Sequence, residues 1–185
     1  MGSGQSGTTQ VRYRPAGFSF LELMVVASIL AIFAGLLLNR LFYYQEVAEK
    51  TNMEATVKAL QSGLRYEMAR ALMAGQEIDY QHLAHENPMN WLEVRPPNYV
   101  GAFKGSPPDD ISSGSWYFDL SSRILVYRIG SGRYFIPDSH NQKQVQFRLV
   151  LSYGGIQGDG AIGDSPMVVS GIKLSVIEPY RWLSP

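Results

Sequence analysis

Residues 18–38 constrain this chain more than any other segment, because their 21 positions hold a single ionisable side chain, that of Glu22. A helix of this length spans roughly 31 Å, which is close to the ~30 Å hydrocarbon core of a bilayer. Helices of soluble proteins usually carry an apolar stripe rather than apolar residues on every face. The segment therefore predicts a transmembrane helix near the N-terminus.

The preceding residues 1–17 are rich in Gly, Ser and Thr, which is typical of a leader rather than of a folded segment. Arg12 and Arg14 precede the apolar segment and only Arg40 follows closely, so we expect a cytoplasmic N-terminus. A secretory signal would place the small residues of its cleavage site after the apolar segment, whereas Ala16 and Gly17 precede it. Cleavage at this point would leave the helix in the mature protein.

Composition excludes several classes of function. The chain has 16 basic and 16 acidic residues, so its formal charge of zero gives no electrostatic footprint for nucleic acid. It has no cysteine, which excludes disulfides and cysteine-based zinc or redox sites. Its 185 residues favour one domain with an appendage.

A helical pattern of apolar residues continues through residues 39–75, where the residues between them are more polar. We expect one face of this continuation to be buried, formed by Leu41, Ala48, Val57, Leu60, Leu64, Met68 and Leu72. Glu46 with Lys50, and Glu54 with Lys58, have the i,i+4 spacing of surface ion pairs. No proline interrupts residues 18–74, and Gly75 is a suitable stop. The sequence thus predicts one helix with a transmembrane half and an amphipathic half.

The remainder, residues 76–185, predicts a β-rich globular head. Proline pairs in residues 76–114 indicate a long connection with at most a turn of helix near Met89. The alternating apolar patterns that follow predict strands at residues 116–120, 124–129, 133–136, 145–152 and 167–177. Strands joined by short turns favour an antiparallel sheet, one face of which the helix would cover. The expected fold class is α+β, a long N-terminal α-helix packed on a C-terminal antiparallel β-sheet.

The start of the apolar segment carries a specific motif: Gly, an aromatic residue, a hydroxyl and then an acid, in Gly17, Phe18, Ser19, Phe20, Leu21 and Glu22. With its basic leader it resembles the type IV prepilin family, which includes pilins and the pseudopilins of type II secretion systems. The resemblance implies that a membrane-embedded aspartyl peptidase cuts after Gly17 and methylates the new N-terminus, so that Phe18 becomes N-methylphenylalanine. It also implies a structural subunit without enzymatic activity or cofactor. Its partners would be that peptidase and methyltransferase, other pilin or pseudopilin subunits, an inner-membrane assembly platform and, before assembly, membrane lipid.

Glu22 has a physical role on this interpretation. An unpaired carboxylate is costly inside a bundle of packed helices, and the amine of Phe18 in the same or a neighbouring subunit would pair with it. Ala27, Ala31 and Gly35 recur at every fourth position and form a small-residue face for close helix packing, unless they simply reflect the composition of membrane helices.

Two departures from the family pattern favour a minor subunit. Asn39 stands where many major subunits have a proline, and the C-terminal cysteine pair of many pilins is absent. The motif does not distinguish among pilus, type II secretion and DNA-uptake systems. The alternative function is a signal-anchored periplasmic binding or sensor protein with a β-rich head, and a membrane-tethered enzyme is a third class for which no catalytic constellation is recognisable.

Other motifs in the head are interpreted as loops. Residues 158–163 spell GxGxxG, but a β-rich run follows where a dinucleotide site needs a helix. Asp159 and Asp164 are weak candidates for calcium ligands, because two carboxylates supply too few of the roughly six to eight oxygens that calcium needs. A solvated turn is the favoured interpretation of this loop. His82, His85 and Glu86 lack a recognisable metal motif.

Overall fold

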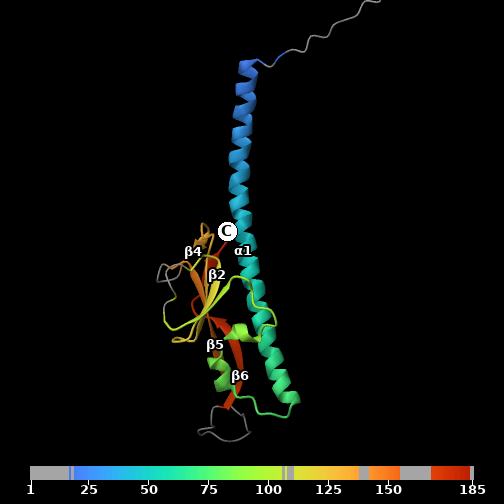
Figure 1. Cartoon of the computed structure of the whole chain (residues 1–185), viewed down its shortest axis with the longest axis vertical. Coiled ribbons are helices and arrows are strands. Elements are labelled where there is room, and N and C mark those ends of the chain that lie inside the picture. Colours follow the sequence, from blue (N-terminus) through green and yellow to red (C-terminus); the bar gives the residue numbers. More distant parts are fainter. Residues whose placement is uncertain are drawn as a thin grey trace, which may run out of the picture. The chain divides into compact units, whose positions relative to one another are not determined.

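A computed structural model describes residues 17, 19–105, 107, 111–137, 142–154 and 168–183. The chain divides into two compact units, Met1–Leu41 and Phe42–Pro185. Helix α1 (Phe20–Met73) begins in the first unit and ends in the second, as Figure 1 shows in blue to green. The prediction of one uninterrupted helix is confirmed.

Helix α1 ends where the sequence predicts a stop. Gly75 has φ +65°, a left-handed conformation that glycine adopts without a Cβ penalty. The Gln76 N–H donates to the Ala71 carbonyl (3.0 Å), and the Gly75 N–H donates to the Leu72 carbonyl (3.1 Å). These two hydrogen bonds form a Schellman motif, which satisfies carbonyls at the end of the helix.

In the first unit, the part of α1 that follows the leader has apolar side chains exposed on all sides. It meets the length and hydropathy requirements for a membrane span, and none of that span is buried within the described chain. No core of its own holds this part of the helix. Its apolar surface is suited to lipid or to other helices.

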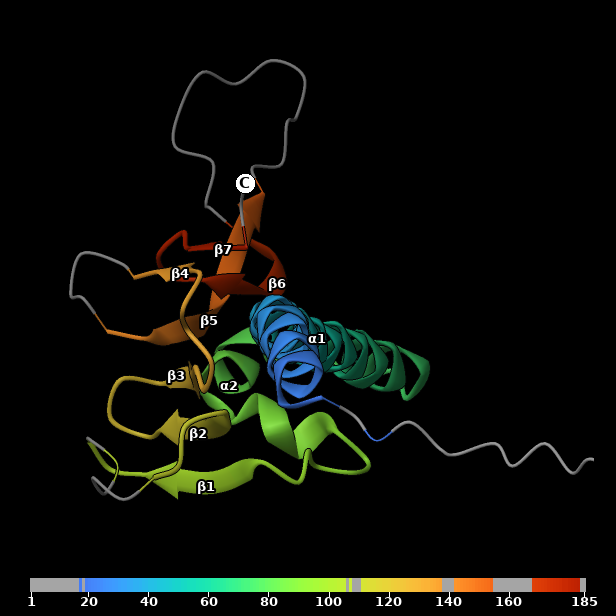
Figure 2. The ribbon, with the colours of Figure 1, turned by 90° about the horizontal axis from the view of Figure 1, so that it is seen from above.

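The second unit contains a five-stranded sheet in the order β1-β2-β3-β5-β6. These strands are β1 (Tyr99–Phe103), β2 (Ser115–Asp119), β3 (Ile124–Arg128), β5 (Gln144–Gly154) and β6 (Val168–Val176). A separate antiparallel pair joins β4 (Phe135–Ile136) to β7 (Arg181–Trp182). Figure 2, seen along α1, shows the strands following one another beside the helix. The α+β fold class is confirmed.

The region 76–114 differs from the expected connection. It contains α2 (Tyr80–His85), the 3₁₀ turn η1 (Pro88–Trp91) and strand β1. Strand β1 pairs with β2 in parallel, so the sheet is mostly rather than wholly antiparallel. The apolar alternation that identifies other strands is weak in β1, because it is short and Gly101 at φ +122° interrupts it.

The core of the second unit lies between α1 and one face of the sheet. Strand β5 shows the predicted alternation, with Val145, Phe147 and Leu149 buried. The helix contributes fewer residues than expected: Leu60 and Leu64 are buried, and Val57 and Met68 are partly buried. Met53, which the predicted stripe omitted, is 1% exposed, whereas Leu41, Ala48 and Leu72 are exposed. The prediction of the buried face is wrong at those three positions. Leu41 and Leu72 lie beyond the buried residues at either end, and Ala48 lies on the side of the helix opposite to the buried Glu46 and Met53.

Candidate functional site

The motif residues lie at the beginning of α1. Gly17 and Ser19 are exposed and outside any helix or strand, and the Ser19 carbonyl accepts a hydrogen bond from the Leu23 N–H (3.0 Å) at the start of the helix. Phe18 and the leader lie outside the described residues. The backbone beside the expected cleavage point is therefore accessible at Gly17 and is not part of the helix.

Glu22 lies in the first turn of α1 and is exposed. A negative charge near a helix N-terminus interacts favourably with the unpaired N–H groups there. Among the described residues Glu22 has no ion pair. Its carboxylate is thus free for a partner supplied from outside the described chain.

Ala27, Ala31 and Gly35 lie on one side of α1 and are exposed. A Cβ placed on Gly35 would meet nothing within 4 Å. The small-residue face therefore has no packing role among the described residues. It is open to a second helix.

A buried carboxylate, Glu46, holds the β3–β4 connection against α1. Its side chain is 1% exposed and accepts the Arg133 N–H (2.6 Å), the Tyr134 N–H (3.1 Å) and the Trp182 indole N–H (3.1 Å). These N–H donors satisfy the charge without a cation, which makes its burial tolerable.

Glu49 repeats this arrangement one turn later. Its carboxylate accepts the Gly130 N–H (2.6 Å), the Ser131 N–H (2.8 Å) and the Tyr127 hydroxyl (3.1 Å). Burial, and then the Glu49 charge and hydrogen bond, raise the pKa of Tyr127. We call Glu46 and Glu49 the carboxylate clamp, because together they fix residues 130–134 on the helix.

The position of Glu46 in the clamp shows that the expected Glu46–Lys50 surface ion pair does not form. Glu46 is directed into the head rather than toward Lys50, and the Lys50 ammonium instead lies 3.9 Å from Glu54 and donates to the Trp182 carbonyl (3.0 Å). Spacing alone could not reveal this, since an i,i+4 Glu–Lys pair has the same pattern whether its acid faces solvent or core.

The candidate metal ligands do not form a site in the described part of the chain. His82 Nδ1 lies 3.2 Å from a Glu86 oxygen, and His85 Nδ1 lies 2.6 Å from the Gln81 carbonyl. No group of three or more potential ligands occurs among the described residues. Asp159, Asp164 and the GxGxxG segment lie outside them.

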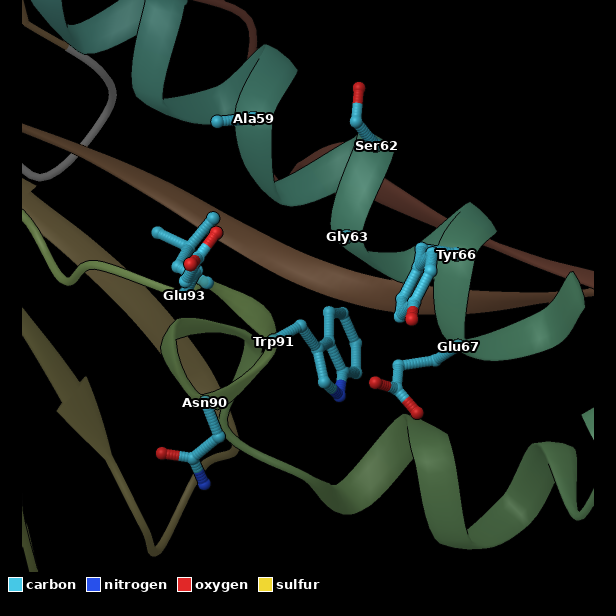
Figure 3. Close-up of a pocket in the computed structure, with 9 residues that line it drawn as sticks. Ala59, Ser62, Gly63, Tyr66, Glu67, Asn90, Trp91 and Glu93 are labelled. Carbon is cyan, nitrogen blue, oxygen red and sulfur yellow. The ribbon is translucent and has the colours of Figure 1, made fainter. Parts of the chain in front are cut away.

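A groove of about 650 Å³ runs between α1 and residues 90–93, which form the end of η1 and the segment after it. Figure 3 shows Trp91 turned toward Gly63 and Tyr66. A Cβ on Gly63 would lie 3.1 Å from both Cβ and the carbonyl oxygen of Trp91, so this glycine permits a close approach. Its place in the helix has a packing reason that the sequence did not indicate.

Comparison with known proteins identifies the N-terminal segment. Residues 12–38 match the family described as "Prokaryotic N-terminal methylation motif". The chain therefore carries the type IV prepilin-like signature, and the motif implies processing by a peptidase and assembly with other pilin-like subunits. No curated protein and no solved structure matches the chain significantly.

Proposed function

We propose that this protein is a structural subunit of a type IV pilus-like or type II secretion pseudopilus filament, without catalytic activity of its own. The observation that carries the proposal is the methylation motif at residues 12–38, placed directly on an exposed apolar helix. The head and the length of α1 add support, since a long helix packed on a mostly antiparallel sheet is pilin-like.

The chemistry is performed on this chain rather than by it. Water hydrolyses the Gly17–Phe18 peptide bond in the peptidase, which releases the Gly17 carboxylate and the Phe18 amine. A methyl donor then transfers one methyl group to that nitrogen, which loses a proton and remains basic. The accessible backbone at Gly17 supports cleavage next to this residue.

Glu22 acts as the register determinant for assembly. Two unit charges ~4 Å apart attract by about 4 kcal/mol at an effective dielectric of about 20. The carboxylate has no ion pair among the described residues, and the methylated amine of Phe18, in the same or a neighbouring subunit, supplies the cation. A wrong axial offset would leave a buried, unpaired charge.

The face of Ala27, Ala31 and Gly35 allows neighbouring helices to approach closely. Head-to-tail packing of this kind need not close and generates a helical fibre. Before assembly the helix crosses the inner membrane once, with the N-terminus in the cytoplasm and the head in the periplasm. The inner-membrane assembly platform then extracts it into the filament. The absence of proline at Asn39 and of a cysteine pair supports a minor subunit.

The substitution Glu22→Val tests the assembly role. We expect normal cleavage and carbonate-resistant membrane association, because the helix becomes more apolar, but a large loss of incorporation into sheared filaments. Ser28→Val is the matched control, since Ser28 is exposed on the same helix and its hydroxyl bonds only to the Met24 carbonyl. Normal incorporation of the Glu22→Val protein would refute the register role.

A further inference from the structure

Aromatic side chains gather where the second unit begins. The rings of Tyr43 and Tyr134 meet edge to face with centroids 5.9 Å apart, and Tyr44 lies 5.8 Å from Tyr43 in the same way. The Arg133 guanidinium lies 5.0 Å from the centroid of the Phe42 ring. The apolar members remain accessible, with exposed fractions of 38% to 63% for Phe42, Tyr43, Tyr44, Tyr134 and Ile136.

The fold holds these side chains outward. The carboxylate clamp fixes the backbone of Arg133 and Tyr134 through Glu46. Phe135 packs inward, with its ring edge to face at 5.7 Å from Trp182, so the neighbouring residues Tyr134 and Ile136 face the other way. Because Phe135 is buried in the core, the side chains of Tyr134 and Ile136 on either side of it are exposed.

Chain connectivity places this cluster near the membrane boundary. Phe42 is four residues beyond Leu38, the end of the apolar segment, and four residues of α1 rise by about 6 Å. The headgroup layer extends roughly 5–8 Å beyond the hydrocarbon core. Tyrosine is enriched in this layer, where its ring and hydroxyl meet apolar and polar surroundings.

The charges in the cluster also suit phospholipid. Arg133 is exposed, and Arg181, which pairs in register with Ile136, adds a second exposed cation. The nearby acids Glu46 and Glu49 are occupied by N–H and hydroxyl donors of the head. The cluster thus offers two guanidinium groups to phosphate oxygens, which they bind well.

We propose that an interfacial patch binds phospholipid headgroups of the leaflet on the head's side; its residues are Phe42, Tyr43, Tyr44, Arg133, Tyr134, Ile136 and Arg181. The inference rests on the proposed membrane-inserted state. The patch seats the head on the bilayer before assembly, so that extraction of the subunit must break these contacts.

Lipid quenching in reconstituted full-length protein tests the patch. The chain has no cysteine, so Ile136→Cys and Met73→Cys each give a single labelling site for a fluorophore. Met73 is 89% exposed and lies about 45 Å further along α1 than Tyr43, at 1.5 Å per residue. In vesicles of phosphatidylcholine and phosphatidylglycerol with headgroup-nitroxide lipid, we expect several-fold stronger quenching at position 136 than at position 73.

Substitutions in the patch test which side chains bring position 136 close to the lipid headgroups. Tyr44→Ser with Tyr134→Ser should reduce quenching at position 136 several-fold, and Arg133→Gln should reduce the part that depends on phosphatidylglycerol. Tyr66→Ser is the matched control, because Tyr66 is a 67% exposed tyrosine of α1 outside the patch.

Carbonate extraction distinguishes failure of the interfacial patch from failure of the proposed function. Protein that resists carbonate but is quenched equally at positions 136 and 73 overturns the patch and leaves the proposed function intact. Protein that carbonate extracts overturns both. Cross-linking of position 136 to a second copy in place of lipid quenching would assign the surface to subunit contacts and also overturn the proposal.

Discussion

At the scale of single residues, Glu46 shows how a charge is accommodated in the core without a counter-ion. Three N–H groups from two distant segments converge on one carboxylate, and every buried side-chain polar atom among the described residues has a hydrogen-bond partner. Hydrogen bonds to charged groups contribute about 1.5–3 kcal/mol each, and loss of one partner leaves the others unsatisfied. The stability of the part of the head around residues 133, 134 and 182 therefore depends on this side chain.

Glu46→Gln should destabilise the protein by about 2–4 kcal/mol, because the amide nitrogen would face N–H donors that now have an acceptor. Urea unfolding of the full chain in detergent, followed by tryptophan fluorescence, measures the effect.

Glu54→Gln is the control for that measurement. It alters a solvent-accessible pair at 3.9 Å and should cost less than about 1 kcal/mol. Equal stabilities for the two variants would contradict the role assigned to Glu46.

At the scale of elements, the sequence predicted correctly those helices and strands whose boundaries are encoded by residues within the segment itself. The hairpin of β2 and β3, the alternation of β5 and the glycine stop of α1 were all expected, because apolar period and turn chemistry are encoded within each segment. Strand β1 and strand β7 were missed, since both are short and gain their stability from partners elsewhere in the chain.

The N-terminal motif could be recognised because it is contiguous. The carboxylate clamp and the interfacial patch could not, because they join α1 to residues more than eighty positions later. A Glu–Lys spacing of four suggested a surface pair, and only tertiary packing shows that Glu46 is buried.

The contact between α1 and strand β3 predicts a pH dependence. In the folded protein burial and then the Glu49 carboxylate raise the pKa of Tyr127 above its reference of 10.0, and burial also raises the pKa of Tyr117 and Tyr180. A raised folded pKa gives stability that is complete below the unfolded value and is lost as pH rises above it. We expect the free energy of unfolding to fall steeply above about pH 10.

Tyr127→Phe should flatten this alkaline decline and lower neutral-pH stability by about 1 kcal/mol through the lost hydrogen bond. Unfolding curves at several pH values measure both effects. Tyr44→Phe, at a 63% exposed position, should leave the decline unchanged, and an unaltered slope in Tyr127→Phe would contradict the assignment.

At the scale of the whole molecule, two units that differ in how their apolar surface is covered share one helix. The first unit has an apolar surface with no cover among the described residues, and the second has its own core. On the proposed function, a chain built in this way exchanges lipid for other helices around α1 while the head stays folded. On the same proposal, processing at Gly17 creates the amine with which Glu22 pairs in the filament.

The most direct test is the intact mass of the protein isolated from its native host, with a second prepilin of the same sample as a control for active peptidase. We expect a chain that begins at Phe18 and carries one added methyl group, and we expect the Gly17→Ala protein to retain the leader. A wild-type chain that still begins at Met1, beside a correctly processed control, would contradict it.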